Sequence, residues 1–206
     1  FSSACRLCVG SLCRSLFFDT QKMTAKKATF KAKKKTKKYT IVLKDNKGKA
    51  IANKVITYSI NGVTKTVKTD ANGIAKITVN QAKAGAYYYS LCFLGDDDYK
   101  SAFKSVKVTV NKQATKAVFK AKTFKVKAKT KKVSFTLKDA SGKAIKGKKI
   151  TVKVNGKTYT AKTNAKGKAT FKIKKLIKKG TYKSTVTFKG NKYYNKVSKK
   201  VKIKIR

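Results

Sequence analysis

Side chains suited to acid–base or nucleophilic chemistry are scarce in this chain. Among 206 residues there is no His, and the seven acids are all Asp. A Ser-His-Asp or Cys-His arrangement therefore cannot be built. Residues 112–206 hold one acid, Asp139, which excludes paired-carboxylate chemistry there and makes a Lys–Asn isopeptide bond an outcome we do not expect. We predict that the protein is not an enzyme and uses no cofactor and no small-molecule substrate.

Two groups of residues have types that could bind a metal. Cys5 and Cys8 are spaced like half of a zinc knuckle, but a zinc site needs four ligands, and Cys92 lies far away in a predicted strand. Asp96-Asp97-Asp98 offers oxygen atoms, whereas Ca²⁺ requires six to eight. We therefore predict no metal site, and we interpret the three aspartates as local counter-charges to lysines.

The strongest chemical signal is positive charge. Lys and Arg number 55 and the formal net charge is +48, yet the only arginines are Arg6, Arg14 and Arg206. Lysine is a mobile point charge, whereas arginine offers a rigid fork for stereospecific phosphate recognition. A surface made of lysine predicts diffuse attraction to a polyanion such as a wall polymer, a membrane surface or a nucleic acid. No apolar run is long enough to predict a transmembrane helix.

These lysines must be positioned by a repeated unit. Leu43-Lys-Asp45 recurs as Leu137-Lys-Asp139, and Asn61-Gly62 recurs as Asn155-Gly156, with a spacing of 94 residues. After an insertion near Leu176, the spacing is 95 residues. Such a long period indicates tandem domains rather than solenoid units. We expect three segments: a flexible or non-native leader over 1–23, a first repeat over 24–111 and a second repeat over 112–206.

Each repeat has the pattern of about seven short strands. Apolar and polar residues alternate with a period of two, which is typical of half-buried antiparallel strands, and Asn155-Gly156 predicts a two-residue hairpin. We predict an all-β protein made of two tandem immunoglobulin-like antiparallel β-sandwiches. The strands expected in the second repeat are Phe124–Val126, Val133–Lys138, Lys149–Val154, Lys157–Thr163, Lys168–Ile173, Gly180–Lys189 and Val197–Ile205.

The sixth strand of each repeat begins at a glycine, Gly85 or Gly180. Tyr87 and Tyr182 each stand two residues later, at the place of a tyrosine corner. We predict a structural role for both, with the hydroxyl group reaching back to the preceding loop. In the second repeat, the alternation also predicts that Val186 and Phe188 face the core.

The repeated motifs resemble the tandem bacterial-type immunoglobulin-like repeats of adhesin-like surface proteins. The lysine-rich version is most similar to those of methanogenic archaea, although it lacks the proline that many such repeats carry. The resemblance covers residues 24–206 and implies a secreted, wall-associated protein whose repeats act as a stalk or as wall-binding modules. In the second repeat the motifs lie at 137–145, 155–159, 163–171, 178–182 and 188–194.

The lysines at mostly outward strand positions of the second repeat are the candidate anion-binding surface. We expect an extracellular module at the cell surface or wall, held by an anionic wall polymer and open to contact with other surface proteins. One alternative is a nonspecific nucleic-acid-binding protein, although no recognition helix, RNP-like motif or phosphate loop is present. Another is a structural spacer whose lysines only solubilise it. The candidate residues are Lys149, Lys153, Lys157, Lys162, Lys168, Lys172, Lys174, Lys183 and Lys189.

Overall fold

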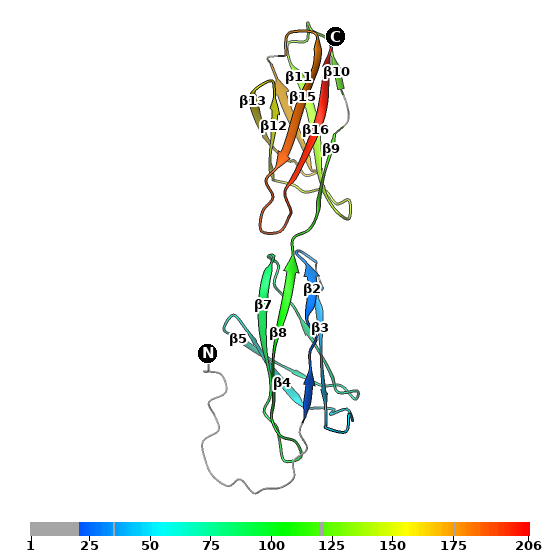
Figure 1. The fold of residues 1–206 in the computed structure, drawn as a ribbon, viewed down its shortest axis with the longest axis vertical. Helices are drawn as coiled ribbons and strands as arrows, with labels where there is room; N and C mark the ends of the chain where they lie inside the picture. The colour runs from blue at the N-terminus through cyan, green and yellow to red at the C-terminus, as the bar shows by residue number, and fades with distance from the viewer. Residues whose placement is uncertain (1–20, 35, 120–121, 175) are drawn as a thin grey trace. The chain divides into compact units, whose positions relative to one another are not determined.

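The computed structural model describes residues 21–34, 36–119, 122–174 and 176–206. These residues form sixteen β-strands and no helix, so the predicted all-β class is confirmed (Figure 1). The described part accordingly contains no helix able to cross a membrane. Cys5, Cys8 and Cys13 lie outside the described residues.

The first sandwich is built from one three-stranded and one five-stranded sheet. The sheet orders are β1-β3-β6 and β2-β8-β7-β4-β5. Met23 on β1 is 7% exposed, so the sandwich already uses residues of the segment expected to be a leader. Its strands are β1 (Lys22–Thr24), β2 (Ala28–Lys31), β3 (Lys38–Lys44), β4 (Val55–Ile60), β5 (Val63–Lys68), β6 (Ile74–Thr78), β7 (Gly85–Phe93) and β8 (Ala102–Asn111).

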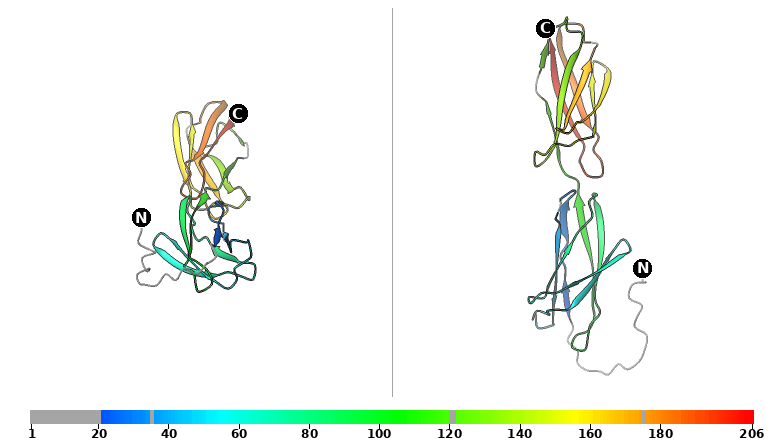
Figure 2. Two further views of the ribbon diagram at one scale, coloured as in Figure 1. Left: turned by 60° about the horizontal axis from the view of Figure 1, so that its bottom comes forward. Right: turned by 180° about the vertical axis from the view of Figure 1, so that it is seen from behind.

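The second sandwich repeats this plan with sheet orders β9-β11-β14 and β13-β12-β15-β16-β10. The orange β15 and red β16 lie in front in Figure 1, and the yellow-green β11 of the other sheet is in front when seen from behind in Figure 2. Its strands are β9 (Thr115–Phe119), β10 (Lys122–Phe124), β11 (Lys131–Asp139), β12 (Lys149–Val154), β13 (Lys157–Lys162), β14 (Lys168–Ile173), β15 (Gly180–Phe188) and β16 (Val197–Ile205).

The first strand of each sandwich is split between the two sheets. In the second sandwich, β9 pairs antiparallel with β11, whereas β10 pairs parallel with β16. The first sandwich pairs β1 and β2 in the same way. The sequence prediction missed β9 and placed the following strand two residues late, at Phe124–Val126. The reason is that this short edge segment alternates weakly, since Ala117 is the only fully buried residue of β9.

The apolar alternation places the core between the two sheets as predicted. Val133, Phe135 and Leu137 on β11 are buried, and so are Val186 and Phe188 on β15. The ring of Phe135 stacks on Phe119 with centroids 4.8 Å apart and meets the ring of Phe171 edge-on at 5.8 Å. These two ring contacts join all three strands of the smaller sheet.

The Asn-Gly turns connect β4 to β5 and β12 to β13. Asn155 and Gly156 have φ angles of 46° and 72°, and their counterparts Asn61 and Gly62 have 49° and 77°. Both central residues therefore adopt the positive φ of a type I′ turn, which matches the twist of a hairpin. The turn fixes the register, with Val154 opposite Lys157 and Lys149 opposite Lys162.

Candidate anion-binding surface

The structure divides the predicted lysines between two sheets. Lys149, Lys153, Lys157, Lys162, Lys183 and Lys189 belong to or follow strands of the five-stranded sheet, whereas Lys168, Lys172 and Lys174 belong to or follow β14. The two sheets turn their outer faces in opposite directions, so the nine residues do not form one patch. Lys157 stands opposite the buried Val154. It is nevertheless exposed, because it is the first residue of the edge strand β13.

Lysines face outward on four adjacent strands of the five-stranded sheet. Lys149 lies opposite Lys162, and Lys183 lies opposite Lys202. Like charges at directly opposed positions are destabilising. We call this set of residues the lysine face; its members are Lys149, Lys153, Lys162, Lys183, Lys189, Lys200, Lys202 and Lys204.

Three members of the lysine face were missed by the sequence analysis. Lys200, Lys202 and Lys204 are exposed, and they alternate on β16 with the buried Val201, Ile203 and Ile205. The same alternation was visible in the sequence and could have identified them.

The first sandwich has the same positions but not the same charges. The counterparts of Lys149, Lys183 and Lys189 are Val55, Tyr88 and Leu94, which are 44%, 63% and 73% exposed. The fold therefore forms without lysines at these three places, and lysines are fewer on this face of the first sandwich than on that of the second. In order, the eight counterparts are Val55, Ser59, Lys68, Tyr88, Leu94, Ser105, Lys107 and Thr109.

The second sandwich also lacks acids where the first has them in turns. Asp70 Oδ1 accepts hydrogen bonds from the amides of Asn72 and Ile74, at 2.9 and 3.0 Å. Asn164 Oδ1 makes the equivalent pair of bonds, both at 3.0 Å, with the amides of residues 166 and 168. The turn requires an oxygen acceptor rather than a charge, so replacing Asp by Asn retains the geometry and raises the net positive charge.

The single acid of the second repeat is used in a turn. Asp139 Oδ1 accepts hydrogen bonds from Ser141 N at 3.0 Å, Ser141 Oγ at 2.6 Å and Lys143 N at 2.9 Å. It belongs to the three-stranded sheet and does not lie on the lysine face. No acid therefore offsets the lysines of that face.

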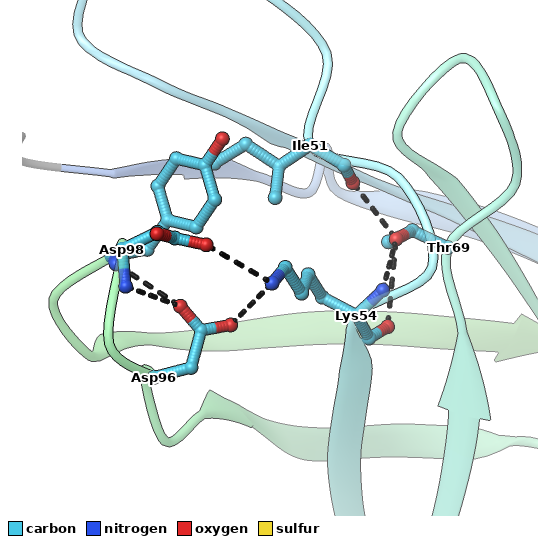
Figure 3. Close-up of polar contacts among 6 residues, drawn as sticks. Ile51, Lys54, Thr69, Asp96 and Asp98 are labelled. Atoms are coloured by element: carbon cyan, nitrogen blue, oxygen red, sulfur yellow. Dashed lines mark hydrogen bonds and ion pairs between the residues drawn. The ribbon is translucent and has the colours of Figure 1, made fainter.

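Two of the aspartates at 96–98, Asp96 and Asp98, lie beside a lysine of the first sandwich (Figure 3). Lys54 Nζ lies 2.7 Å from Asp96 Oδ2 and 3.9 Å from Asp98 Oδ2. The hydrogen bond from Lys54 lowers the pKa of Asp96, and the same bond raises the pKa of Lys54. Asp96 Oδ1 also accepts from the amides of Asp98 and Tyr99. Both carboxylate oxygens of Asp96 are thus occupied by protein donors. Among the described residues, no group of three or more potential ligands forms a metal site.

Not every lysine contributes to the surface charge. Lys131, at the start of β11, is 1% exposed, and its Nζ donates hydrogen bonds to the backbone oxygens of Ala128 at 2.8 Å and Val126 at 3.3 Å. Its counterpart Lys37 is 3% exposed, and burial lowers the pKa of Lys37. The two bonds of Lys131 close the bend before β11.

Tyr87 on β7 and Tyr182 on β15 each bond to the loop that leads into their own strand. The hydroxyl of Tyr87 donates to the backbone oxygen of Lys83, and that of Tyr182 donates to Lys178, each at 3.0 Å. Both side chains are half-buried. The two bonds are internal to the sandwiches and hold the ends of β7 and β15.

Comparison with known proteins supports the fold. No protein-family model matches the chain, and no curated protein sequence matches it. The structure is similar to invasin, a bacterial integrin-binding protein, with a TM-score of 0.52 and 16% identity over 90% of this chain and 39% of that chain. It is also similar to the titin domains Z1Z2 in complex with telethonin, with a TM-score of 0.50 and 12% identity over 93% of this chain and 98% of that chain. The fold is immunoglobulin-like. At these identities the likeness concerns the fold alone, and the chain spans about two fifths of the length of the invasin chain.

Proposed function

We propose that the protein is a non-enzymatic, adhesin-like module of the cell surface whose second sandwich associates with an anionic cell-wall polymer. The lysine face is the binding surface, and the first sandwich acts as a spacer. One observation carries the proposal: the face is lined by lysines in the second sandwich, whereas the same positions of the first sandwich are mostly uncharged.

Solubility alone does not account for this distribution. A small domain needs a net charge of only about 2–8 to remain soluble. The first sandwich tolerates exposed Val55, Tyr88 and Leu94 on the equivalent face. The second sandwich instead opposes lysine to lysine across its strands and carries Asn164 where the first has Asp70, which increases self-repulsion. A polyanion spread over the face would relieve this repulsion.

The likeness to invasin, a bacterial integrin-binding protein, supports this role only through the shared fold. The proposal places the chain outside the cell, at the wall. Lysines on strands, without a helix to enter a groove, favour a flexible anionic polymer over a DNA duplex as the partner.

Binding to an immobilised polymer tests the proposal. We expect the full chain to be retained by polygalacturonate at low salt, to be released as salt rises because screening increases, and to pass through neutral dextran. Double-stranded DNA serves as the second polyanion. Failure to bind polygalacturonate at low salt would contradict the proposal, and tighter binding to DNA at physiological salt would favour a nucleic-acid-binding protein.

A further inference from the structure

A pocket of about 290 Å³ opens at the edge of the lysine face, where β12 and the end of β15 meet. It lies wholly within the second sandwich. Its lining includes Phe188 and Thr160 as well as three lysines, one asparagine and two threonines that neighbour each other on β12 and β15. The latter six residues are Lys148, Lys149, Lys189, Asn191, Thr151 and Thr187.

The counterpart of this place in the first sandwich is filled by a carboxylate. Lys148 corresponds to Lys54, and Asn191 corresponds to Asp96. In the first sandwich, the Nζ atom of Lys54 is held 2.7 Å from Asp96 Oδ2. The repeat thus has a position that receives a carboxylate oxygen beside this lysine.

Asn191 retains one function of Asp96 and loses the other. Its Oδ1 atom accepts hydrogen bonds from the amides of Tyr193 and Tyr194, at 2.8 and 3.0 Å, as Asp96 Oδ1 does from the amides of Asp98 and Tyr99. These bonds turn the Nδ2 group of Asn191 to where the second oxygen of Asp96 lies. The side chain there is consequently a donor, beside a lysine that is also a donor.

A buried threonine bonds the backbone amide of Lys148, as its counterpart does for Lys54. Thr163 Oγ1 accepts a hydrogen bond from Lys148 N at 2.9 Å and donates one to the backbone oxygen of Ile145 at 2.7 Å. Thr69 makes the equivalent bonds to Lys54 N at 3.0 Å and Ile51 O at 2.8 Å (Figure 3). These bonds fix the backbone from which the Lys148 side chain extends, and Asp139 Oδ1 is bonded within its own turn.

We propose that this pocket is a carboxylate-binding subsite, in which a ligand carboxylate lies beside Asn191 and gives Lys148 the negative partner that Asp96 gives Lys54 in the first sandwich. One oxygen accepts hydrogen bonds from Lys148 Nζ and Asn191 Nδ2, and Lys149 and Lys189 add positive charge at the rim. The inference rests on the proposed function and deepens it, because the pocket would anchor one acidic residue of a polymer that crosses the lysine face.

The repeat itself supplies the variants that test the subsite. Asn191→Asp places in the second sandwich the carboxylate that the first one has, so it should preserve the turn and pair with Lys148. Asp96→Asn is the reciprocal change. Lys54 then keeps Asp98 Oδ2 at 3.9 Å and has Val55 and Leu94 in place of the rim lysines, so we expect no acetate site there. Both variants are compatible with the fold, since each residue already occupies the same turn in the other sandwich.

The measurement is a titration of the full chain with sodium acetate against sodium chloride at constant ionic strength, followed by the backbone amide signals of Tyr194 and Tyr99. We expect saturable shifts at Tyr194 in the wild type. The acetate affinity there should fall about tenfold in Asn191→Asp, as the loss of a charge-assisted site implies, and no saturable shifts should arise at Tyr99 in Asp96→Asn, because Asp98 remains beside Lys54. Titration with phosphate compares the two anions.

Equal acetate shifts at Tyr194 in the wild type and in Asn191→Asp would overturn the subsite, as would shifts that never saturate. A phosphate affinity well above that for acetate would overturn the assignment to carboxylate. Retention on polygalacturonate is a separate readout: if it persists while the acetate site fails, the proposed function stands without the subsite. If acetate binds at Tyr194 but the polymer does not bind, the subsite stands and the proposed function is wrong.

Discussion

Replacing Thr163 by Val tests how the second sandwich holds the lysine of the pocket. The side chain of Thr163 is 4% exposed, and its hydroxyl makes one hydrogen bond to Lys148 N and one to Ile145 O. Valine has nearly the same shape, so packing is retained while both bonds are lost. Each such bond contributes about 0.5–1.5 kcal/mol, so we expect the free energy of unfolding to fall by about 1–3 kcal/mol.

The same substitution should weaken the proposed subsite. Without the Thr163 hydroxyl, the amide of Lys148 loses its hydrogen bond, while Lys148 O still accepts one from Thr163 N at 2.9 Å. The acetate affinity at Tyr194 should therefore fall together with stability. Thr170→Val is the matched control, because Thr170 is exposed on β14 and bonds only to Ser134 Oγ, at 3.1 Å. Surface substitutions of this kind change stability by about 0.5 kcal/mol or less.

Hydrogen exchange resolved by residue is the suitable assay, because it reports on the second sandwich alone. We expect the amide of Lys148 to lose protection in Thr163→Val and to keep it in Thr170→Val. Equal protection of this amide in the two variants, together with equal stability, would refute the reasoning that the buried hydroxyl positions Lys148.

Three further predictions concern the two sandwiches separately. Gly156→Ala and Gly167→Ala both force a non-glycine residue into positive φ, which costs about 1–2 kcal/mol. In denaturant unfolding, Gly167→Ala should reduce the free energy of unfolding clearly more than Gly156→Ala, because the added Cβ at 167 would lie 2.6 Å from a backbone oxygen of β11, whereas the Cβ at 156 would meet open space. The pKa of Asp96 is lowered from its ordinary value of 3.8, so the stability that Asp96 gives the first sandwich is present above that value and is lost as the pH falls through the lower folded pKa. In Asp96→Asn, the free energy of unfolding should therefore depend less on pH over the acid range. Ser184→Ala should leave stability unchanged or raise it in thermal unfolding, since the buried Ser184 hydroxyl lacks a hydrogen-bond partner among the described residues.

Local sequence signals predicted the turns and strands whose residues strongly favour one backbone conformation or one face of a sheet. The Asn-Gly pairs predicted both hairpins, because few other residues adopt two successive positive φ angles. The alternation of Ile150, Val152 and Val154 predicted the ends of β12. The split first strand was not predicted, because a short edge segment buries few side chains and its partners lie far away in the sequence.

The sequence predicted a lysine-rich candidate site, but it did not predict which of the lysines share one face. Alternation showed which lysines point outward, but not which sheet a strand joins, so Lys168 and Lys172 were grouped with residues of the opposite face. The pocket could not be predicted from either repeat alone. We infer a carboxylate ligand from the ion pair between Lys54 and Asp96. These two residues are far apart in the sequence, and only the structure shows that they are neighbours.

The central claim is that polyanions bind the lysine face rather than the molecule as a whole. The direct test compares two triple variants of the full chain, each losing three charges, for binding to polygalacturonate at low salt. Lys153→Ser, Lys200→Ser and Lys204→Thr place residues of the first sandwich on the lysine face, whereas Lys168→Thr, Lys172→Thr and Lys174→Asn change the opposite sheet. A lysine near an anionic surface contributes about 1 kcal/mol, so we expect the first variant to bind on the order of 100-fold more weakly and the second to bind nearly as the wild type does. Equal losses in the two variants would contradict the account, because binding would then follow net charge and not the face.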